Sequence, residues 1–198
     1  MRIDFYFDFI SPFSYLAAER IPDLQQSTGV EVSWIPINLP RLFKLSGNTP
    51  PAMVPNKARY LVKDLRRQAK KMQIPFRLIL PGSFDSRPAL GIACVLSDAD
   101  RARYSSVVFK SLWSGDVDPR QDGWLQQIFA SGRLPAAWNM ALNEDMLTTL
   151  QANTLQAFEA GAFGAPTFVL HYKKRSEMYV GIDHMNDLRA RCLELKGR

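Results

Sequence analysis

Residues 2–21 read RIDFYFDFISPFSYLAAERI, and this stretch decides the fold because a strand pattern runs directly into a helix start. Apolar side chains recur at every second position, which predicts a half-buried strand over residues 2–9. Pro12 suits the first position of a helix, because its φ is preset and its missing N–H is not needed there. We therefore expect a helix over residues 12–27, which stops before Gly29 as helices commonly do.

The next segment completes a β-α-β unit. Residues 30–37, VEVSWIPI, alternate again and predict a second strand, which a right-handed crossover places parallel to the first. Residues 38–56 are rich in proline and asparagine, and they predict a long loop. Loops of this length in a compact domain are usually functional or mobile.

Helical patterns dominate the middle of the chain, and strands return only at its end. The expected helices cover residues 56–73, 86–98, 101–113, 121–131, 134–141 and 143–160. A hairpin follows, with strands over residues 167–171 and 177–180 on either side of a charged turn. A last helix is expected over residues 184–195.

This order of elements predicts the α/β class, with a thioredoxin-like sheet (β-α-β, later β-β-α) and a large inserted all-helical domain. Residues 1–38 and 161–198 are expected to form the thioredoxin-like domain, and residues 39–160 the inserted domain. The inserted domain contains a loop over residues 44–57 that is a candidate ligand contact. A length of 198 residues fits one domain with an insertion.

Composition and charge exclude several classes of function. The chain is 46% hydrophobic and 22% charged, as ordinary globular proteins are, and its apolar runs are too short to span a bilayer. The net charge is +6, and its densest cluster, residues 66–71, lies on an expected helix. Such a run is typical of a solvated helix face and not of a nucleic-acid site. A second interpretation is that the charge attracts a small anionic ligand.

The cysteines and histidines limit the chemistry further. Cys94 and Cys192 are far apart and form no C-x-x-C pair, and no export signal follows Arg2. These features favour a reducing compartment, so we expect the cytoplasm. With only His171 and His184 available, a histidine-based metal site has almost no ligands, and we expect no metal.

Two separate segments could build a binding site. Ser11 stands just before the first helix, where it is either a helix N-cap or a hydroxyl beside an anion held at the helix start. In GAFGAPT, residues 161–167, the bond before Pro166 is a candidate cis peptide, and the alternative is a trans turn residue at a strand start. In thioredoxin folds a cis proline faces the start of the first helix. The backbone of the residue before it pairs with a bound peptide.

With both segments present, the chain resembles the family of 2-hydroxychromene-2-carboxylate isomerases and kappa-class glutathione transferases, in the DsbA-like branch of the thioredoxin superfamily. The resemblance covers nearly the whole chain. The matching segments are FYFDFISPFSYLA, SGNTPPAMVPNKARYLVKDL, QIPF, AGAFGAPT and VGIDHM. It implies glutathione as the cofactor, a small aromatic or electrophilic second substrate, and a homodimer.

The resemblance also implies roles for particular residues. Ser11 matches the catalytic hydroxyl that hydrogen-bonds the glutathione sulfur, and the glutathione-binding positions are Asn48, Lys57, Ala165, Pro166 and Asp183. Taken alone, Asp183 is equally a helix N-cap and Lys57 a solvated lysine. The family usually has Ser or Asn before the acid and Arg after it, where this chain has Ile182 and His184.

For the second substrate we expect Phe13, Trp113 and Arg87, the last as a carboxylate partner. The two aromatic residues are equally core candidates, and Arg87 is equally a residue at a helix entry.

The function implied first is a glutathione-dependent isomerase. It would add an activated glutathione thiolate to an unsaturated aromatic acid and then eliminate it. The alternatives are a kappa-class-like transferase that releases the conjugate, and a thioredoxin-fold binding module without catalysis. Disulfide exchange is excluded, because serine cannot perform it and no cysteine lies near Ser11 in the sequence.

Overall fold

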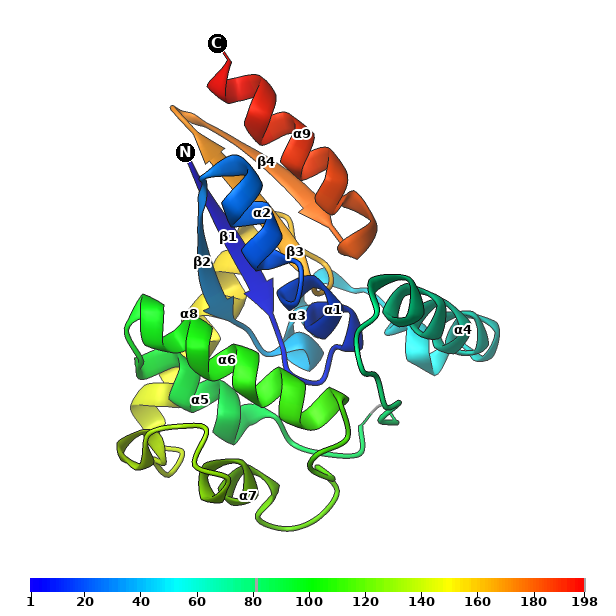
Figure 1. The fold of residues 1–198 in the computed structure, drawn as a ribbon, viewed down its shortest axis with the longest axis vertical. Helices are drawn as coiled ribbons and strands as arrows, with labels where there is room; N and C mark the ends of the chain where they lie inside the picture. The colour runs from blue at the N-terminus through cyan, green and yellow to red at the C-terminus, as the bar shows by residue number, and fades with distance from the viewer. Residues whose placement is uncertain (81, 198) are drawn as a thin grey trace.

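The computed structural model describes residues 1–80 and 82–197, and its centre is a four-stranded sheet with the order β2-β1-β3-β4 (Figure 1). The strands are β1 (Arg2–Phe7), β2 (Glu31–Pro36), β3 (Thr167–Tyr172) and β4 (Arg175–Val180). β1 pairs in parallel with β2 and antiparallel with β3, and β3 and β4 form the expected hairpin. The predicted β-α-β start and β-β-α end are therefore confirmed.

Helices surround this sheet and fill the chain between β2 and β3. The α-helices of the described residues are α1 (Pro12–Ala18), α2 (Ile21–Thr28), α3 (Leu39–Ser46), α4 (Pro55–Met72), α5 (Arg87–Val95), α6 (Asp98–Trp113), α7 (Trp124–Ala130), α8 (Glu144–Glu159) and α9 (Met185–Lys196). Three short 3₁₀ helices are η1 (Pro51–Met53), η2 (Ala136–Trp138) and η3 (Ile182–His184). None of the helices in the described residues is both long and apolar enough to cross a membrane.

The core lies on the aromatic face of β1. Phe5 stacks on Phe168 of β3 with ring centroids 5.0 Å apart, and it meets the edge of Trp34 of β2 at the same distance. Phe7 and Phe9 continue this cluster towards Phe109 of α6. The other face of β1 is buried as well, because Tyr6 packs in a second cluster with Leu42 of α3 and Ala157 of α8. The strand that was expected to be half-buried is therefore covered on both faces.

Figure 1 shows how the helices are distributed around the sheet. Helices α5, α6 and α7 gather beyond the end where β1 and β2 finish, α8 passes behind β2, which it contacts, and α4 projects to the opposite side from β2. α1 lies between these two groups and contacts both α4 and α6. A site on α1 therefore has the helical block on one side and α4 on the other.

Three sequence expectations were wrong in detail, and proline explains two of them. The single helix expected over residues 12–27 is two helices, because Pro22 lacks an N–H and clashes with the preceding turn unless it stands at a helix start. The long loop expected over residues 38–56 contains α3 and η1. Pro40 occupies the first turn of α3, so it marks a helix start there and not a loop.

The start and end of α3 follow ordinary capping rules. The Asn38 side chain accepts a hydrogen bond from the Arg41 N–H (3.0 Å), and Gly47 ends the helix with a left-handed φ of 66°. The third error concerns residues 134–141, expected as a helix. Only η2 forms there, a single turn that begins directly after Pro135.

Candidate active site

Ser11 joins the start of α1 to the segment before β3. Its hydroxyl accepts a hydrogen bond from the Ser14 N–H (3.1 Å), as an N-cap does, and it lies 3.1 Å from the carbonyl oxygen of Ala165, to which it donates. The side chain is buried, with 4% of its surface exposed. The two alternatives for Ser11 are therefore compatible, because one hydroxyl caps the helix and also faces the second segment.

The Ala165–Pro166 segment is held at both ends. Its peptide bond is cis, and the Pro166 carbonyl accepts a hydrogen bond from the Gly181 N–H (2.9 Å) just after β4. Gly181 has a φ of 85°, a conformation that favours glycine. This turn brings Asp183, two residues later in the chain, to the same end of the sheet as Ala165.

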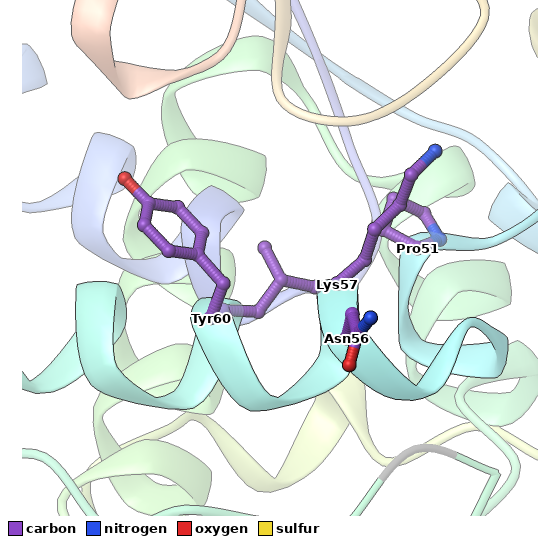
Figure 2. Close-up of a pocket in the computed structure, with 5 residues that line it drawn as sticks. Pro51, Asn56, Lys57 and Tyr60 are labelled. Carbon is purple, nitrogen blue, oxygen red and sulfur yellow. The ribbon is translucent and has the colours of Figure 1, made fainter.

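Asn48 is tied to the same segment from the insertion. Its side-chain amide donates to the carbonyl oxygen of Phe163 (2.9 Å), two residues before Ala165. Lys57 lies in the first turn of α4 and lines an open cavity of about 420 Å³, together with Pro51, Asn56 and Tyr60. Figure 2 shows the Lys57 and Tyr60 side chains rising from the same side of α4, with Pro51 beside Lys57.

Asp183 is exposed, and it accepts a hydrogen bond from the Gln68 amide of α4 (3.2 Å). The residues on either side of Asp183, Ile182 and His184, are the two that differ from those usual in the family. Ile182 is buried in the core with 2% exposure, so its side chain offers no polar contact. His184 is exposed and pairs with Asp187 of α9 at 3.1 Å. Among the positions that the resemblance implies, Ser11, Asn48, Ala165 and Pro166 are thus linked by hydrogen bonds around one segment, and Asp183 follows the turn that holds it.

The three residues expected in a second-substrate pocket have different surroundings. Trp113 is buried in the core, where its indole N–H donates to the carbonyl oxygen of Phe9 (3.0 Å), so it holds the turn before Ser11 and cannot reach solvent. Phe13 is half-buried and packs against the core. Arg87 is exposed, and its guanidinium already forms two hydrogen bonds with the carboxylate of Asp85 (2.9 and 2.7 Å).

Arg87 also lines a second cavity, which lies next to residues 8–11, the turn that contains Ser11. The cavity has a volume of about 490 Å³. Ile10, the residue before Ser11, forms part of its wall, and Phe84 and Leu150 add apolar surface. Arg41 and Lys44 of α3 add positive charge. The chemistry of this lining suits a molecule with an apolar ring and an anionic group.

The sequence interpretation missed Asp8, which directly follows β1 and is fully buried. Its carboxylate accepts hydrogen bonds from the Ile10 N–H (3.1 Å), the Leu39 N–H (2.8 Å) and the Ser86 hydroxyl (2.7 Å). Burial raises the pKa of the Asp8 carboxyl to about 6, although these donors act in the opposite direction. A charged residue in an otherwise apolar strand end was the available signal, but its partners come from distant parts of the chain.

These observations define a class of protein: a thioredoxin-like sheet in which a serine hydroxyl, and not a cysteine pair, faces the backbone before a cis proline. Such a site cannot exchange disulfides by itself, but it offers a hydroxyl and a peptide backbone to a ligand that brings its own sulfur. The donor set thus fits a peptide thiol.

The comparisons with known proteins agree with this class. The family model for DSBA-like thioredoxin domains matches residues 2–192. A 2-hydroxychromene-2-carboxylate isomerase of Pseudomonas putida is 33% identical, over 93% of this chain and 91% of its own length. A protein named glutathione S-transferase kappa 1, from Caenorhabditis elegans, is 32% identical, over 89% of this chain and 83% of its own.

A solved structure gives the same result. A 2-hydroxychromene-2-carboxylate isomerase structure superposes with a TM-score of 0.84 at 30% sequence identity, covering 98% of this chain and 96% of the other. The chain belongs to the DSBA-like thioredoxin family, within the group that contains these isomerases and the kappa-class glutathione transferases. The relatives are enzymes, and this chain is an enzyme of the same group.

Proposed function

We propose that this protein is a glutathione-dependent isomerase of the 2-hydroxychromene-2-carboxylate isomerase type. The observation that carries the proposal is the 3.1 Å hydrogen bond between the Ser11 hydroxyl and the Ala165 carbonyl. It brings the hydroxyl that would hold a sulfur against the backbone that would hold the cysteine of glutathione. When bound, glutathione would supply a thiolate that adds to an unsaturated carbon of the substrate. The carbon–sulfur bond would then break again, which releases the isomerised acid and returns glutathione unchanged.

In this proposal the Ser11 hydroxyl turns its one proton from the Ala165 carbonyl to the sulfur when glutathione binds, and Ala165 and Pro166 present backbone to the cysteine of glutathione. Asn48 and Lys57 contact glutathione, and Asp183 holds the γ-glutamyl ammonium. Support comes from the exposure of Lys57 and Asp183 and from the Asn48–Phe163 hydrogen bond, which ties Asn48 to the segment before Ala165. Because the Ile182 side chain is apolar and buried, Asp183 would bind the γ-glutamyl end of glutathione without help from a polar side chain at position 182.

Simple arithmetic shows what Ser11 can contribute. A free thiol with a pKa near 8.5 is ionised to about 3% at pH 7. If Ser11 lowers that pKa to about 7, the thiolate fraction rises about 16-fold. Because nucleophilicity falls with basicity, roughly five-fold of this gain is lost, and about three-fold remains. Most of the rate must therefore come from holding the second substrate against the sulfur.

We assign that task to the cavity beside Ile10. Its apolar walls suit an aromatic ring, and Arg41 and Lys44 suit a carboxylate, whereas the charge of Arg87 is already paired with Asp85, which lines the same cavity. The cavity adjoins the residue before Ser11, so a substrate bound there is a neighbour of the sulfur. Phe13, which is half-buried beside Ser11, remains a second candidate for the wall.

A kappa-class-like glutathione transferase is the second candidate, because a relative of that name is 32% identical over 89% of this chain. Both activities begin with the same addition of sulfur to an electrophile. They differ in whether the carbon–sulfur bond breaks again before product release, and the glutathione site does not control that outcome.

The experiment that tests the proposal incubates the protein with reduced glutathione and 2-hydroxychromene-2-carboxylate and follows the absorbance change of the acid. An isomerase changes the spectrum and leaves all the glutathione free at the end, whereas a transferase consumes one glutathione per product. No change with either this acid or a general electrophile, combined with no thermal stabilisation by millimolar glutathione, contradicts both candidates.

We also propose that the enzyme works as a cytoplasmic homodimer in the breakdown of aromatic compounds. Both cysteines are free, which suits a reducing compartment. Light scattering of the purified protein tests the dimer directly.

A further inference from the structure

Asp8 forms hydrogen bonds within the turn of residues 8–11, and the function proposed above gives it no role. Its backbone carbonyl accepts from the Ser11 N–H (3.0 Å), and its Oδ1 accepts from the Ile10 N–H (3.1 Å). Together these bonds fold residues 8–11 into one turn. The position of the Ser11 hydroxyl therefore depends on where the Asp8 side chain is held.

Two further donors hold that side chain, and both come from the insertion. Oδ2 accepts from the N–H of Leu39, the first residue of α3 (2.8 Å), and Oδ1 accepts from the Ser86 hydroxyl (2.7 Å). Ser86 stands at the N-cap position of α5, yet its side chain makes no cap bond to that helix. Its hydroxyl serves Asp8, although serine at this position normally satisfies the N–H groups of its own helix.

Stability is a poor explanation for this arrangement. Asp8 is fully buried, and within residues 1–80 and 82–197 no cation forms an ion pair with it. A buried carboxylate without a cation is unfavourable for folding, even with several hydrogen bonds. A group that costs stability and sits at the catalytic turn is expected to serve the reaction.

The same side chain also connects the turn to the cavity beside it. Ser86 and Ile10 both line that cavity, and both donate to Oδ1 of Asp8. The Asp8 carboxylate thus holds both the cavity wall, through Ile10 and Ser86, and the turn that carries the Ser11 hydroxyl.

We propose that Asp8 is a positioning residue, which holds the Ser11 hydroxyl at the glutathione sulfur and fixes that hydroxyl relative to the second-substrate cavity. The inference rests on the proposed function. It adds that the ionised Asp8 side chain acts through Ser11, without touching either substrate.

The test is Asp8→Asn, which keeps the shape of the side chain but turns one acceptor oxygen into an NH₂ group facing donors. Asp4→Asn is the matched control, because Asp4 is also buried on β1 but pairs with Arg2 and His171 away from the turn. The first readout is the pKa of the bound glutathione thiol, measured as thiolate absorbance at 240 nm against pH. The second is kcat and KM with the chromene acid.

We expect the wild type and Asp4→Asn to lower the thiol pKa equally. Asp8→Asn should raise it back by about one unit, as the loss of a charge-assisted hydrogen bond does. Its kcat at pH 7 should fall by more than the roughly twofold that one unit of thiol pKa costs, because the turn also loses its place beside the cavity, and KM for glutathione should change less than about threefold. Its thermal midpoint at pH 7.5 should not fall below that of Asp4→Asn, whereas a merely structural Asp8 would lower the midpoint and leave the thiol pKa alone.

The outcomes separate this inference from the proposed function. A wild type that leaves the thiol pKa of glutathione unchanged overturns both. A wild type that lowers it, with an Asp8→Asn variant that lowers it equally, overturns the role of Asp8 alone. If Asp8→Asn does not fold, Ser86→Ala decides, because it removes one donor to Oδ1. It should raise the thiol pKa by a smaller amount, and an unchanged value contradicts the inference.

Discussion

The Ser11 hydroxyl and the Ala165 carbonyl, 154 positions apart in the chain, meet in a hydrogen bond of 3.1 Å. The bond joins the strand-to-helix turn at the start of the chain to the segment that precedes β3. The same Ser11 oxygen accepts from the Ser14 N–H, so the hydroxyl is fixed from two sides before any ligand arrives. The position of the oxygen is thus fixed in advance, and its one proton needs only to turn from the Ala165 carbonyl to a bound sulfur.

Removing this hydroxyl should cost both activity and stability. Ser11→Ala should return the thiol pKa of bound glutathione from about 7 towards 8.5, so kcat at pH 7 should fall about threefold through the lost ionisation. Loss of the N-cap should lower the unfolding free energy by about 1 kcal/mol. Steady-state kinetics and denaturant unfolding measure the two effects.

Ser14→Ala is the matched control for Ser11→Ala. Its hydroxyl is also buried in the same turn, but it has no hydrogen-bond partner among the described residues. The control should keep the wild-type rate. Equal losses in both variants would indicate that the turn tolerates no change, and they would contradict a specific role for Ser11.

Asp183→Asn should weaken glutathione binding while leaving the chemistry intact. The carboxylate is exposed, and its one hydrogen bond, from Gln68, can be kept by the asparagine oxygen. The loss of an ionic contact to the γ-glutamyl ammonium should raise KM for glutathione about 10-fold, with kcat within about twofold. Asp122→Asn, which removes another exposed carboxylate, should change neither. A lower kcat at unchanged KM would place the γ-glutamyl group elsewhere.

Trp113→Phe tests how far α6 holds the segment from Phe9 to Ser11 in place. Phenylalanine keeps the stacking on Phe76 but leaves the buried Phe9 carbonyl without its donor. We expect a loss of about 1–3 kcal/mol in the free energy of unfolding, and a lower kcat because Ser11 follows Phe9 by two residues. Calorimetry and kinetics measure both.

Trp124→Phe provides the comparison for Trp113. Its ring packs on Phe84 in the helical block, and its indole N–H forms no hydrogen bond within the described part of the chain. This variant should lose clearly less stability and keep its kcat. A Trp113 variant that behaves like it would rule out the Phe9 contact as a support of the turn.

Asp8 should make stability depend on pH in a defined direction. Its folded-state pKa is raised to about 6 from 3.8, mainly by burial and slightly by the negative charge of Asp85. Between these values the folded chain holds a proton that the unfolded chain releases, so this contribution is fully present below pH 4 and is lost as the pH rises through 6. Denaturant unfolding from pH 4 to 7.5 should show this slope in the wild type and a smaller one in Asp8→Asn. Identical slopes would contradict the raised pKa.

The sequence was sufficient for the sheet and for the two ends of the site, because these depend on local patterns. Alternation from Ile3 to Phe9 predicts β1, and the glycine-rich approach to Pro166 marks the segment opposite Ser11. Proline was misread where its position mattered. Pro22 begins a second helix but was passed over inside one expected helix, and Pro40 opens α3 but was counted among the prolines of an expected loop.

What the sequence could not provide were contacts between distant segments. From the sequence, Trp113 is equally a pocket residue or a core residue. Only the structure shows that its indole N–H donates to the carbonyl oxygen of Phe9, 104 positions away. Asp8 and Ser86 carry no motif, and only the fold brings the hydroxyl to the carboxylate. Such pairs depend on tertiary packing, which local periodicity does not record.

A crystal structure of the complex with reduced glutathione tests the central claim most directly. We predict the sulfur within hydrogen-bond distance of the Ser11 hydroxyl, and the cysteine backbone of glutathione paired with the backbone of Ala165. Glutathione bound with its sulfur away from Ser11, or with its cysteine backbone unpaired with Ala165, would contradict the account.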